Sequence, residues 1–226
     1  MFQVIVDFMY NIVEKLHDLI VNIGITDVGV SYVLAVILFT LIVRLFLLPL
    51  NIKSTRSTAK MQEIQPEVKK LQTKYKNSPE KLNQEMMKLY KENNVSMTGG
   101  CLPMIIQMPI LFALYWAFRQ IHQVSGADFL WIPNLALRDP YFILPVLAAG
   151  STYLSTVFTT KVNAASVENS PMNMSTMNIG MSVMIGVSAI NFESLLVIYW
   201  IVGSLIQMLQ TYVIVVLPKK NKAKAA

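Results

Sequence analysis

Long runs of uncharged, mostly apolar residues alternate with shorter polar segments along this chain. Five runs stand out, over residues 30–50, 102–118, 141–160, 172–192 and 194–217, and only the first contains a charged residue. Each is near the ~20 residues that a helix needs to cross the hydrocarbon core of a bilayer. The pattern therefore predicts an all-α polytopic membrane protein with five transmembrane helices. Continuous apolar runs also argue against a β-barrel, whose strands alternate in polarity.

The fourth run is the weakest of the five because polar side chains dilute it. These are Asn173, Ser175, Asn178, Ser182 and Ser188. A re-entrant segment is the alternative reading of this stretch.

Residues 1–27 have a different pattern. Apolar residues recur every three or four positions up to residue 23, and Asp7, Asn11, Glu14 and Asp18 share the opposite face. This is the pattern of an amphipathic helix that lies in the membrane interface. A poorly apolar first span is the alternative. We expect no secretory signal peptide, because the segment lacks a basic start and carries acids.

The segment 51–100 predicts a helical hairpin outside the bilayer. Its apolar residues form two helical seams, one from Met61 to Tyr75 and one from Leu82 to Asn93. Between them, Ser78-Pro79 reads as a helix N-cap followed by proline at the first helical position. Pro66 should start or kink the first helix. Its ten Lys and Arg residues could contact ribosomal RNA or anionic headgroups, or could simply be solvated.

Charge then assigns the two sides of the membrane. The chain has 19 Lys and Arg residues and 13 Asp and Glu residues. Fifteen of the cations fall in the segment 51–100, at Lys161 and in the tail 218–226, which we place in the cytoplasm by the positive-inside rule. The N-terminus is then outside and the C-terminus inside, which requires an odd number of spans. Residues 28–50 form the first span and residues 101–217 hold spans two to five. Without the fourth span the number would be even, so the charge distribution supports it.

Arg44 is the one charged residue inside a predicted span. Burying a guanidinium near the centre of a bilayer costs about 2.5–3.5 kcal/mol on insertion scales. The sequence places no acid at the same depth, so the charge must meet water entering from the cytoplasm or a negative group from another molecule.

Every predicted span also carries a stripe of polar side chains. We interpret these stripes, together with Arg44, as the wall of a hydrophilic groove; bonding between helices is the alternative for each residue alone. The candidate groove residues are Arg44, Thr40, Gln107, Thr152, Ser155, Thr159, Asn178, Ser182, Trp200, Ser204 and Gln207.

Catalytic, metal and cofactor chemistry finds no support in the sequence. Cys101 is the single cysteine, no Walker motif is present, and the two histidines lie outside the predicted spans. A proton- or cation-coupled carrier would bury an acid or a histidine. An anion pore built on Arg44 and a passive assembly scaffold remain as alternatives.

Several segments resemble the YidC family of membrane-protein insertases, in order over residues 30–215. They are Arg-Leu-Phe-Leu-Leu-Pro-Leu at 44–50, Gly-Gly-Cys-Leu-Pro-Met at 99–104, Gln-Met-Pro-Ile at 107–110, Phe-Leu-Trp-Ile-Pro-Asn-Leu at 129–135, Asp-Pro-Tyr at 139–141, Leu-Pro at 144–145 and Tyr-Trp-Ile-Val at 199–202.

The resemblance implies five core spans around a groove that opens to the cytoplasm and to lipid and holds the arginine. It implies a bacterial cytoplasmic-membrane insertase that works on nascent membrane proteins, including small clients such as the ATP synthase c subunit. It further implies action as a monomer, alone or beside the Sec translocon, with weak ribosome contact through a short tail. The chain departs from the family where many relatives carry a glutamine near Ser155.

Overall fold

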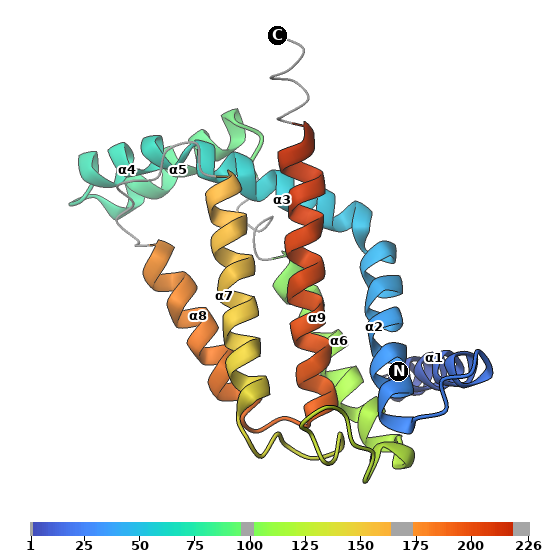
Figure 1. The fold of residues 1–226 in the computed structure, drawn as a ribbon. Helices are drawn as coiled ribbons and strands as arrows, with labels where there is room; N and C mark the ends of the chain where they lie inside the picture. The colour runs from blue at the N-terminus through green and yellow to red at the C-terminus, as the bar shows by residue number, and fades with distance from the viewer. Residues whose placement is uncertain (1, 96–101, 164–173, 219–226) are drawn as a thin grey trace.

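The computed structural model describes residues 2–95, 102–163 and 174–218, and their regular structure is helical apart from one isolated bridge between Phe129 and Ile132 (Figure 1). The all-α prediction is confirmed. The elements are α1 (Phe2–Asn22), α2 (Val28–Phe46), α3 (Leu48–Glu63), α4 (Gln65–Lys74), α5 (Pro79–Glu92), α6 (Leu102–Gln120), η1 (His122–Val124), α7 (Ile143–Asn163), α8 (Met174–Ala189), α9 (Ser194–Thr211) and the π-helical η2 (Tyr212–Val216).

Three stretches are long and apolar enough to cross a membrane by length and composition: Val28–Phe46, Ile143–Thr160 and Ser194–Val216. They correspond to the first, third and fifth predicted runs. Helices α6 and α8 occupy the second and fourth runs, and the apolar part of α8, Asn178–Ala189, is shorter. Helices α7 and α9 stand side by side, and the shorter α8 packs at a tilt against α7 (Figure 1).

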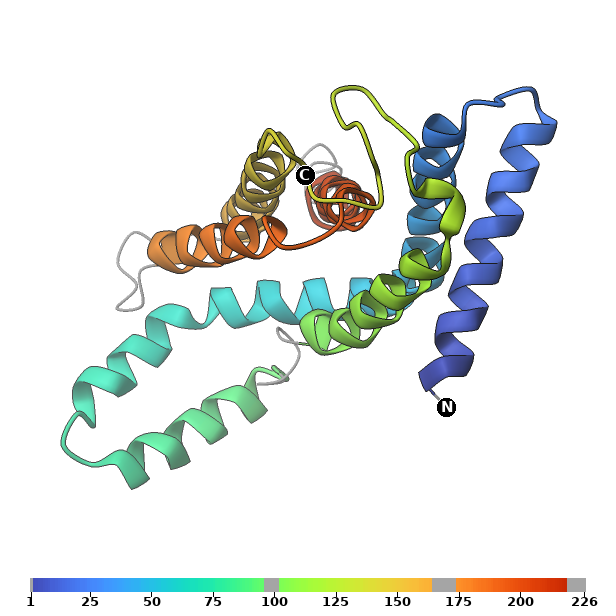
Figure 2. The same ribbon diagram turned by 90° about the horizontal axis from the view of Figure 1, so that it is seen from below.

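Helix α1 runs crosswise to the long helices. Seen from below, α9 is viewed end-on while α1 is viewed along its side, next to α2 and α6 (Figure 2). One stripe, Val6, Val13, His17 and Ile20, is buried against these neighbours, and the His17 ring stacks on Tyr32 at 3.9 Å between centroids. A second apolar stripe stays exposed, at Phe2, Val4, Ile5, Phe8, Leu19 and Ile23. The helix is thus apolar on two sides, and only one of them is used inside the fold.

The chain breaks between α2 and α3 at Leu47. The first predicted span extended to Leu50, but α2 ends at Phe46 and α3 starts at Leu48, turning across the upper end of the molecule (Figure 1). Pro49 explains the break, because its ring would clash with the carbonyl of Leu45 and it has no N–H to donate there. The break lies three residues beyond Arg44, and the N–H of Leu47 still donates to the carbonyl of Val43 in the last turn of α2.

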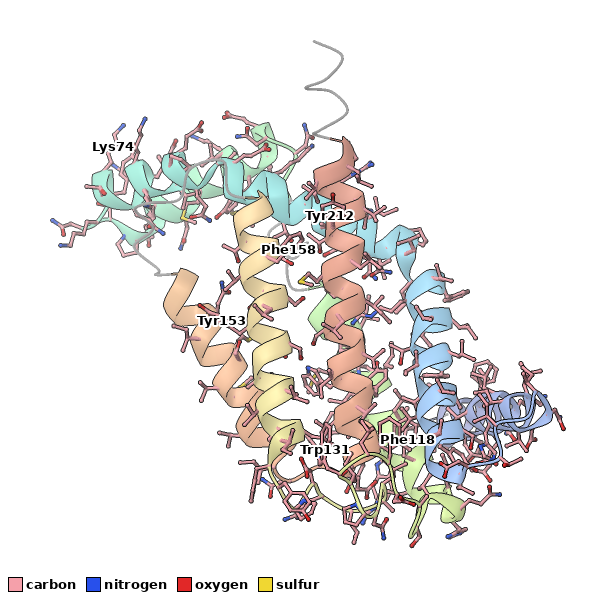
Figure 3. All side chains as sticks on the ribbon, in the orientation of Figure 1. Lys74, Phe118, Trp131, Tyr153, Phe158 and Tyr212 are labelled. Carbon is pink, nitrogen blue, oxygen red and sulfur yellow. The ribbon has the colours of Figure 1, made fainter. Side chains whose placement is uncertain are left out.

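Helices α4 and α5 form the predicted hairpin, whose tip lies near Lys74 (Figure 3). Its two seams meet in one small core of Ile64, Val68, Leu89, Tyr90 and Val95, joined by Met61, Leu71 and Met86. Pro66 stands in the first turn of α4, as expected. Ser78 stands at the N-cap of α5, but its side chain accepts no capping hydrogen bond, so the cap prediction holds for position and not for bonding.

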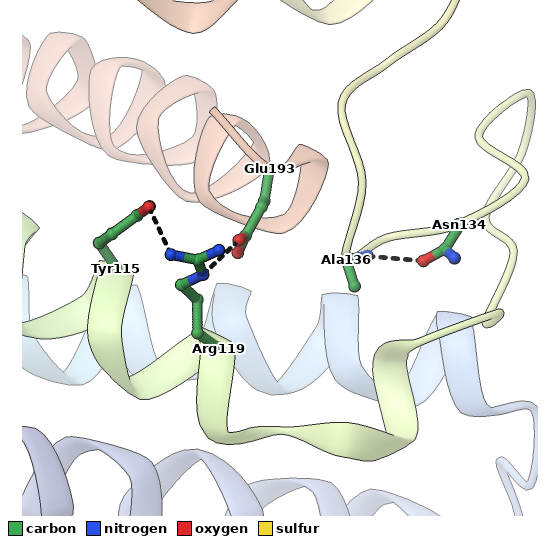
Figure 4. Close-up of polar contacts among 5 residues, drawn as sticks. All are labelled: Tyr115, Arg119, Asn134, Ala136 and Glu193. Atoms are coloured by element: carbon green, nitrogen blue, oxygen red, sulfur yellow. Dashed lines mark hydrogen bonds and ion pairs between the residues drawn. The ribbon is translucent and has the colours of Figure 1, made fainter. Parts of the chain in front are cut away.

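The opposite end is closed by the loop 121–142. Ser194 donates both its N–H and its hydroxyl to the carbonyl of Leu137, at 2.8 and 2.7 Å, which fixes the loop to the start of α9. Beside it, Arg119 Nε lies 3.1 Å from Glu193 and its Nη1 donates to the Tyr115 hydroxyl (Figure 4). Burial raises the pKa of the Glu193 carboxyl, and the charge of Arg119 opposes that rise.

The main core lies in this closed half of the molecule. Its buried members come mainly from the first part of α2, the second half of α6, the loop 121–142 and the first halves of α7 and α9, with Val13 and Ile20 of α1 and Ala189 of α8. They include Tyr32, Phe39, Leu114, Leu135 and Leu195, each at most 1% exposed. Arg44 and the polar stretches of α7 and α8 therefore lie beyond the main core, toward the hairpin.

Candidate functional site

A pocket lies beside Arg44, between the end of α2, the start of α3, α6 and α9. It encloses about 470 Å³, including open space at its mouth. It is lined by Thr40, Val43, Arg44, Leu47, Leu50, Asn51, Ser54, Ile106, Gln107 and Tyr199. Charge, hydroxyl and amide groups thus share one cavity with apolar side chains.

The Arg44 guanidinium has an uncharged partner. Its Nη1 donates to Oε1 of Gln207 on α9. The ion pairs among the described residues are Lys88–Glu85 and Arg119–Glu193, so no carboxylate in this part of the chain neutralises Arg44. The amide of Gln207 carries no net charge, so it does not cancel the positive charge of Arg44, which can still attract an anion.

Two further candidate residues line the same pocket. Thr40 is buried, and its hydroxyl donates to the carbonyl of Val36 at 2.6 Å. Gln107 Nε2 donates to the Tyr199 hydroxyl at 2.8 Å and so connects α6 to α9. The structure therefore brings Arg44, Thr40, Gln107 and Gln207 together.

The candidates on α7 and α8 form a separate polar seam. Asn178 Nδ2 donates to Thr160 Oγ1 at 3.3 Å between the two helices. Thr159 and Ser182 donate to the carbonyls of Ser155 and Asn178, four residues earlier in their own helices. Ser155, Asn178 and Ser182 are buried, and Thr152 Oγ1 is buried without a hydrogen-bond partner among the described residues. Asn178 thus acts between helices, in the way anticipated as the alternative.

The remaining candidates lie on α9 but outside the Arg44 pocket. Trp200 borders a small apolar pocket between α7, α8 and α9, with Ala148, Ile185 and Phe192 among its neighbours. Ser204 is half-buried and does not line the pocket of Arg44.

The face of α9 that meets Arg44 runs through Tyr199, Gly203, Gln207 and Gln210. A Cβ atom added at Gly203 would lie 3.2 Å from Arg44 Nη2, and Gln210 Nε2 donates to the Arg44 carbonyl at 3.2 Å. The predicted stripe shares Gln207 with this face, but its members Trp200 and Ser204 each lie one residue further along α9 than Tyr199 and Gly203. Tyr199, Gly203 and Gln210 were not singled out. The step of three from Gln207 to Gln210 was the one available signal for the last of them.

Metal binding finds no support in the described ranges. They contain no group of three or more His, Cys, Asp or Glu side chains that could hold an ion. The polar groups around Arg44 are amides and hydroxyls, which suit the binding of polar or acidic peptide groups.

The fold and the site together define an all-helical membrane protein in which a half-buried arginine, without a carboxylate partner among the described residues, lies next to a polar pocket. Residues 24–222 match the family model described as 60Kd inner membrane protein. The chain belongs to this family, the YidC family of membrane protein insertases.

Two similar relatives carry the name membrane protein insertase YidC. The protein of Clostridium perfringens is 56% identical over 215 residues, covering 94% of this chain and 90% of its own length. That of Clostridium tetani is 46% identical over 208 residues, covering 92% of each. A solved structure, the active YidC insertase crystal structure with the first transmembrane domain resolved, matches with a TM-score of 0.69 at 27% identity. It covers 91% of this chain, which spans 46% of that longer one.

Proposed function

We propose that this protein is an insertase that moves short hydrophilic segments of nascent membrane proteins across the bilayer by way of Arg44, and then releases the apolar segment into lipid. The observation that carries the proposal is the guanidinium of Arg44, which is half-buried, borders an open pocket and is held by the amide of Gln207. The names of the relatives support the same activity.

Electrostatics gives Arg44 its role. A carboxylate 4 Å from a guanidinium is stabilised by about 4 kcal/mol at an effective dielectric constant near 20, against about 1 kcal/mol in bulk water. An acidic client tail would therefore be attracted into the pocket. Gln207 is neutral, so it can give up its bond to the guanidinium without leaving a second charge exposed.

The pocket would then shorten the hydrophobic distance that the tail must cross. Thr40, Gln107 and Asn51 offer polar groups that replace part of the tail's hydration shell. The polar side chains of α7 and α8 would form the second wall of the groove, and Thr152 contributes a hydroxyl that has no hydrogen-bond partner in the described part of the chain. The client's apolar segment leaves into lipid because burying apolar surface releases about 25 cal/mol per Å².

The wider arrangement follows from the charge distribution. Five spans would surround the groove, with the N-terminus and α1 on the outer surface and the hairpin and the tail 218–226 in the cytoplasm. Clients would be small nascent membrane proteins, such as the ATP synthase c subunit, received by a monomer alone or beside the Sec translocon and the ribosome. No bound cofactor is required by this route.

Arg44→Ala and Arg44→Lys test the role of charge. Each variant is reconstituted in liposomes, and insertion is measured for a client with an acidic tail and for the same client with a neutral tail. We expect Arg44→Ala to slow the acidic client about tenfold, which corresponds to about 1.4 kcal/mol, and Arg44→Lys to restore most of the rate.

Arg119→Ala is the matched control, because it removes an arginine from the closed end of the molecule. Equal losses in Arg44→Ala and Arg44→Lys, or equal losses for the acidic and neutral clients, would reject the electrostatic role of Arg44.

A further inference from the structure

The backbone carbonyls at the end of α2 need hydrogen-bond donors from outside the helix. The last four carbonyls of any helix lack partners within it, and Arg44 belongs to the last turn of α2. The carbonyl of Val43 is satisfied by the N–H of Leu47 at 2.9 Å. The carbonyl of Arg44 accepts instead from the side chain of Gln210, which comes from α9.

The same glutamine also contacts the helix beyond the break. Gln210 Oε1 accepts from Nδ2 of Asn51 at 3.4 Å, and Asn51 on α3 is only 7% exposed. One amide therefore bridges α2, α3 and α9, and it does so across Leu47. Pro49 has no N–H to donate to the carbonyl of Leu45, and the two hydrogen bonds of Gln210 join the helices beside this break.

Gln207 and Gln210 have different tasks, although they lie three residues apart on one face of α9. Gln207 contacts the guanidinium of Arg44, and Gln210 contacts its backbone. Displacing Gln207 by a client carboxylate would leave Gln210 in place. The amide of Gln210 can thus hold the last turn of α2 while the tip of the arginine changes partner.

We propose that Gln210 is a positioning residue for Arg44, because it joins the break between α2 and α3 to α9. Helix α3 leads into the hairpin, so Gln210 couples the direction of α3 to the position of the Arg44 guanidinium. This inference rests on the function proposed above. A purely structural contribution of Gln210 to helix packing is the competing explanation, and it makes different predictions.

Gln210→Met keeps the length and approximate volume of the side chain but removes both hydrogen bonds. We expect it to slow insertion of the acidic-tailed client about three- to tenfold and to leave the neutral-tailed client within twofold of the parent. In an Arg44→Ala background it should add nothing further, because the group that it positions is gone. Leu209→Ala, at a neighbouring exposed residue, is the control and should match the parent.

A distance measurement reports on the break itself. Spin labels at Lys60→Cys on α3 and Val213→Cys on η2, in a Cys101→Ser background, should give a narrow distribution in the parent. Gln210→Met should broaden or shift it, and Leu209→Ala should not.

The outcomes separate the two proposals. An equal proportional loss for Gln210→Met with and without Arg44, or an unchanged distance distribution, would overturn the positioning role while leaving the insertase proposal intact. Normal insertion by Arg44→Ala would overturn the proposed function, whatever Gln210→Met does to the distances.

Discussion

At the scale of single residues, Arg44 is fixed by uncharged groups. Gln207 takes one of its N–H donors, and Gly203 leaves the space in which the other terminal nitrogen lies. An arginine paired to an acid of its own fold would be neutralised, whereas this one keeps its charge while its rotamer is restricted. The geometry around Gly203 makes that restriction testable.

Gly203→Ala should lower insertion of acidic-tailed clients severalfold. The new Cβ would lie 3.2 Å from Arg44 Nη2, so the guanidinium has to shift by a few tenths of an ångström, which disturbs its hydrogen bond to Gln207. Stability should not fall, because alanine is a better helix former than glycine by about 1 kcal/mol. The measurement is the insertion rate together with the thermal unfolding midpoint in detergent.

Gly150→Ala is the control for this change, since a Cβ there meets nothing within 4 Å. If Gly203→Ala inserted the acidic client at the parental rate, the close approach of Arg44 to Gly203 would not matter for insertion.

Arg44 was predictable from the sequence, and Gly203 was not. A charge inside a long apolar run conflicts with its surroundings, and that conflict is visible without coordinates. A glycine has no side chain to add to a periodic pattern, so its close approach to Arg44 appears only when α9 is placed against α2. The prediction of Trp200 and Ser204 in place of Tyr199 and Gly203 has a similar cause. Both pairs are four residues apart, so helical spacing alone does not distinguish them.

At the scale of elements, hydrophobic runs predicted which segments are helical better than where they end. The run 30–50 is continuous in composition, yet Pro49 ends α2 at Phe46 and starts a helix in a new direction. The hairpin seams were predictable because two regular repeats can only be buried against each other. The packing of α7 on α8 depends on small residues, whose effect is invisible in hydropathy.

Gly186→Ala should destabilise the contact between α7 and α8. Its Cβ would come within 2.9 Å of the Ala149 Cβ and 3.4 Å of the Pro145 carbonyl, and neither can rotate away. Overpacking of this kind costs about 1–3 kcal/mol. We expect a lower unfolding midpoint in detergent, measured by circular dichroism.

Gly180→Ala, on the same helix, is the matched substitution, because a Cβ there meets nothing within 4 Å. A drop of equal size in both variants would show that glycine flexibility matters at α8, and not the close contact at Gly186.

At the scale of the whole molecule, the two ends differ in construction. The end with the loop 121–142 holds the main core, and Ile132 and Leu135 of that loop are almost fully buried. The end with the hairpin carries Arg44, its pocket and the polar seam of α7 and α8. Under the function proposed above, the client would enter at the end with the Arg44 pocket, and the apolar core at the other end would prevent ions from leaking through.

This polarity ties the orientation in the membrane to the function, and cysteine labelling tests it. In a Cys101→Ser background, Leu130→Cys lies in the loop 121–142, where the native side chain is 74% exposed, and Lys74→Cys lies at the hairpin tip. A membrane-impermeant maleimide added to intact cells should label Leu130→Cys and leave Lys74→Cys unlabelled until the cells are opened. The Cys101→Ser parent, which has no cysteine, sets the background. The reverse pattern would mean that the positive-inside rule fails for this chain, although fifteen of its cations are predicted to lie on one side. The Arg44 pocket would then open to the outside, where a nascent chain made in the cytoplasm could not reach it.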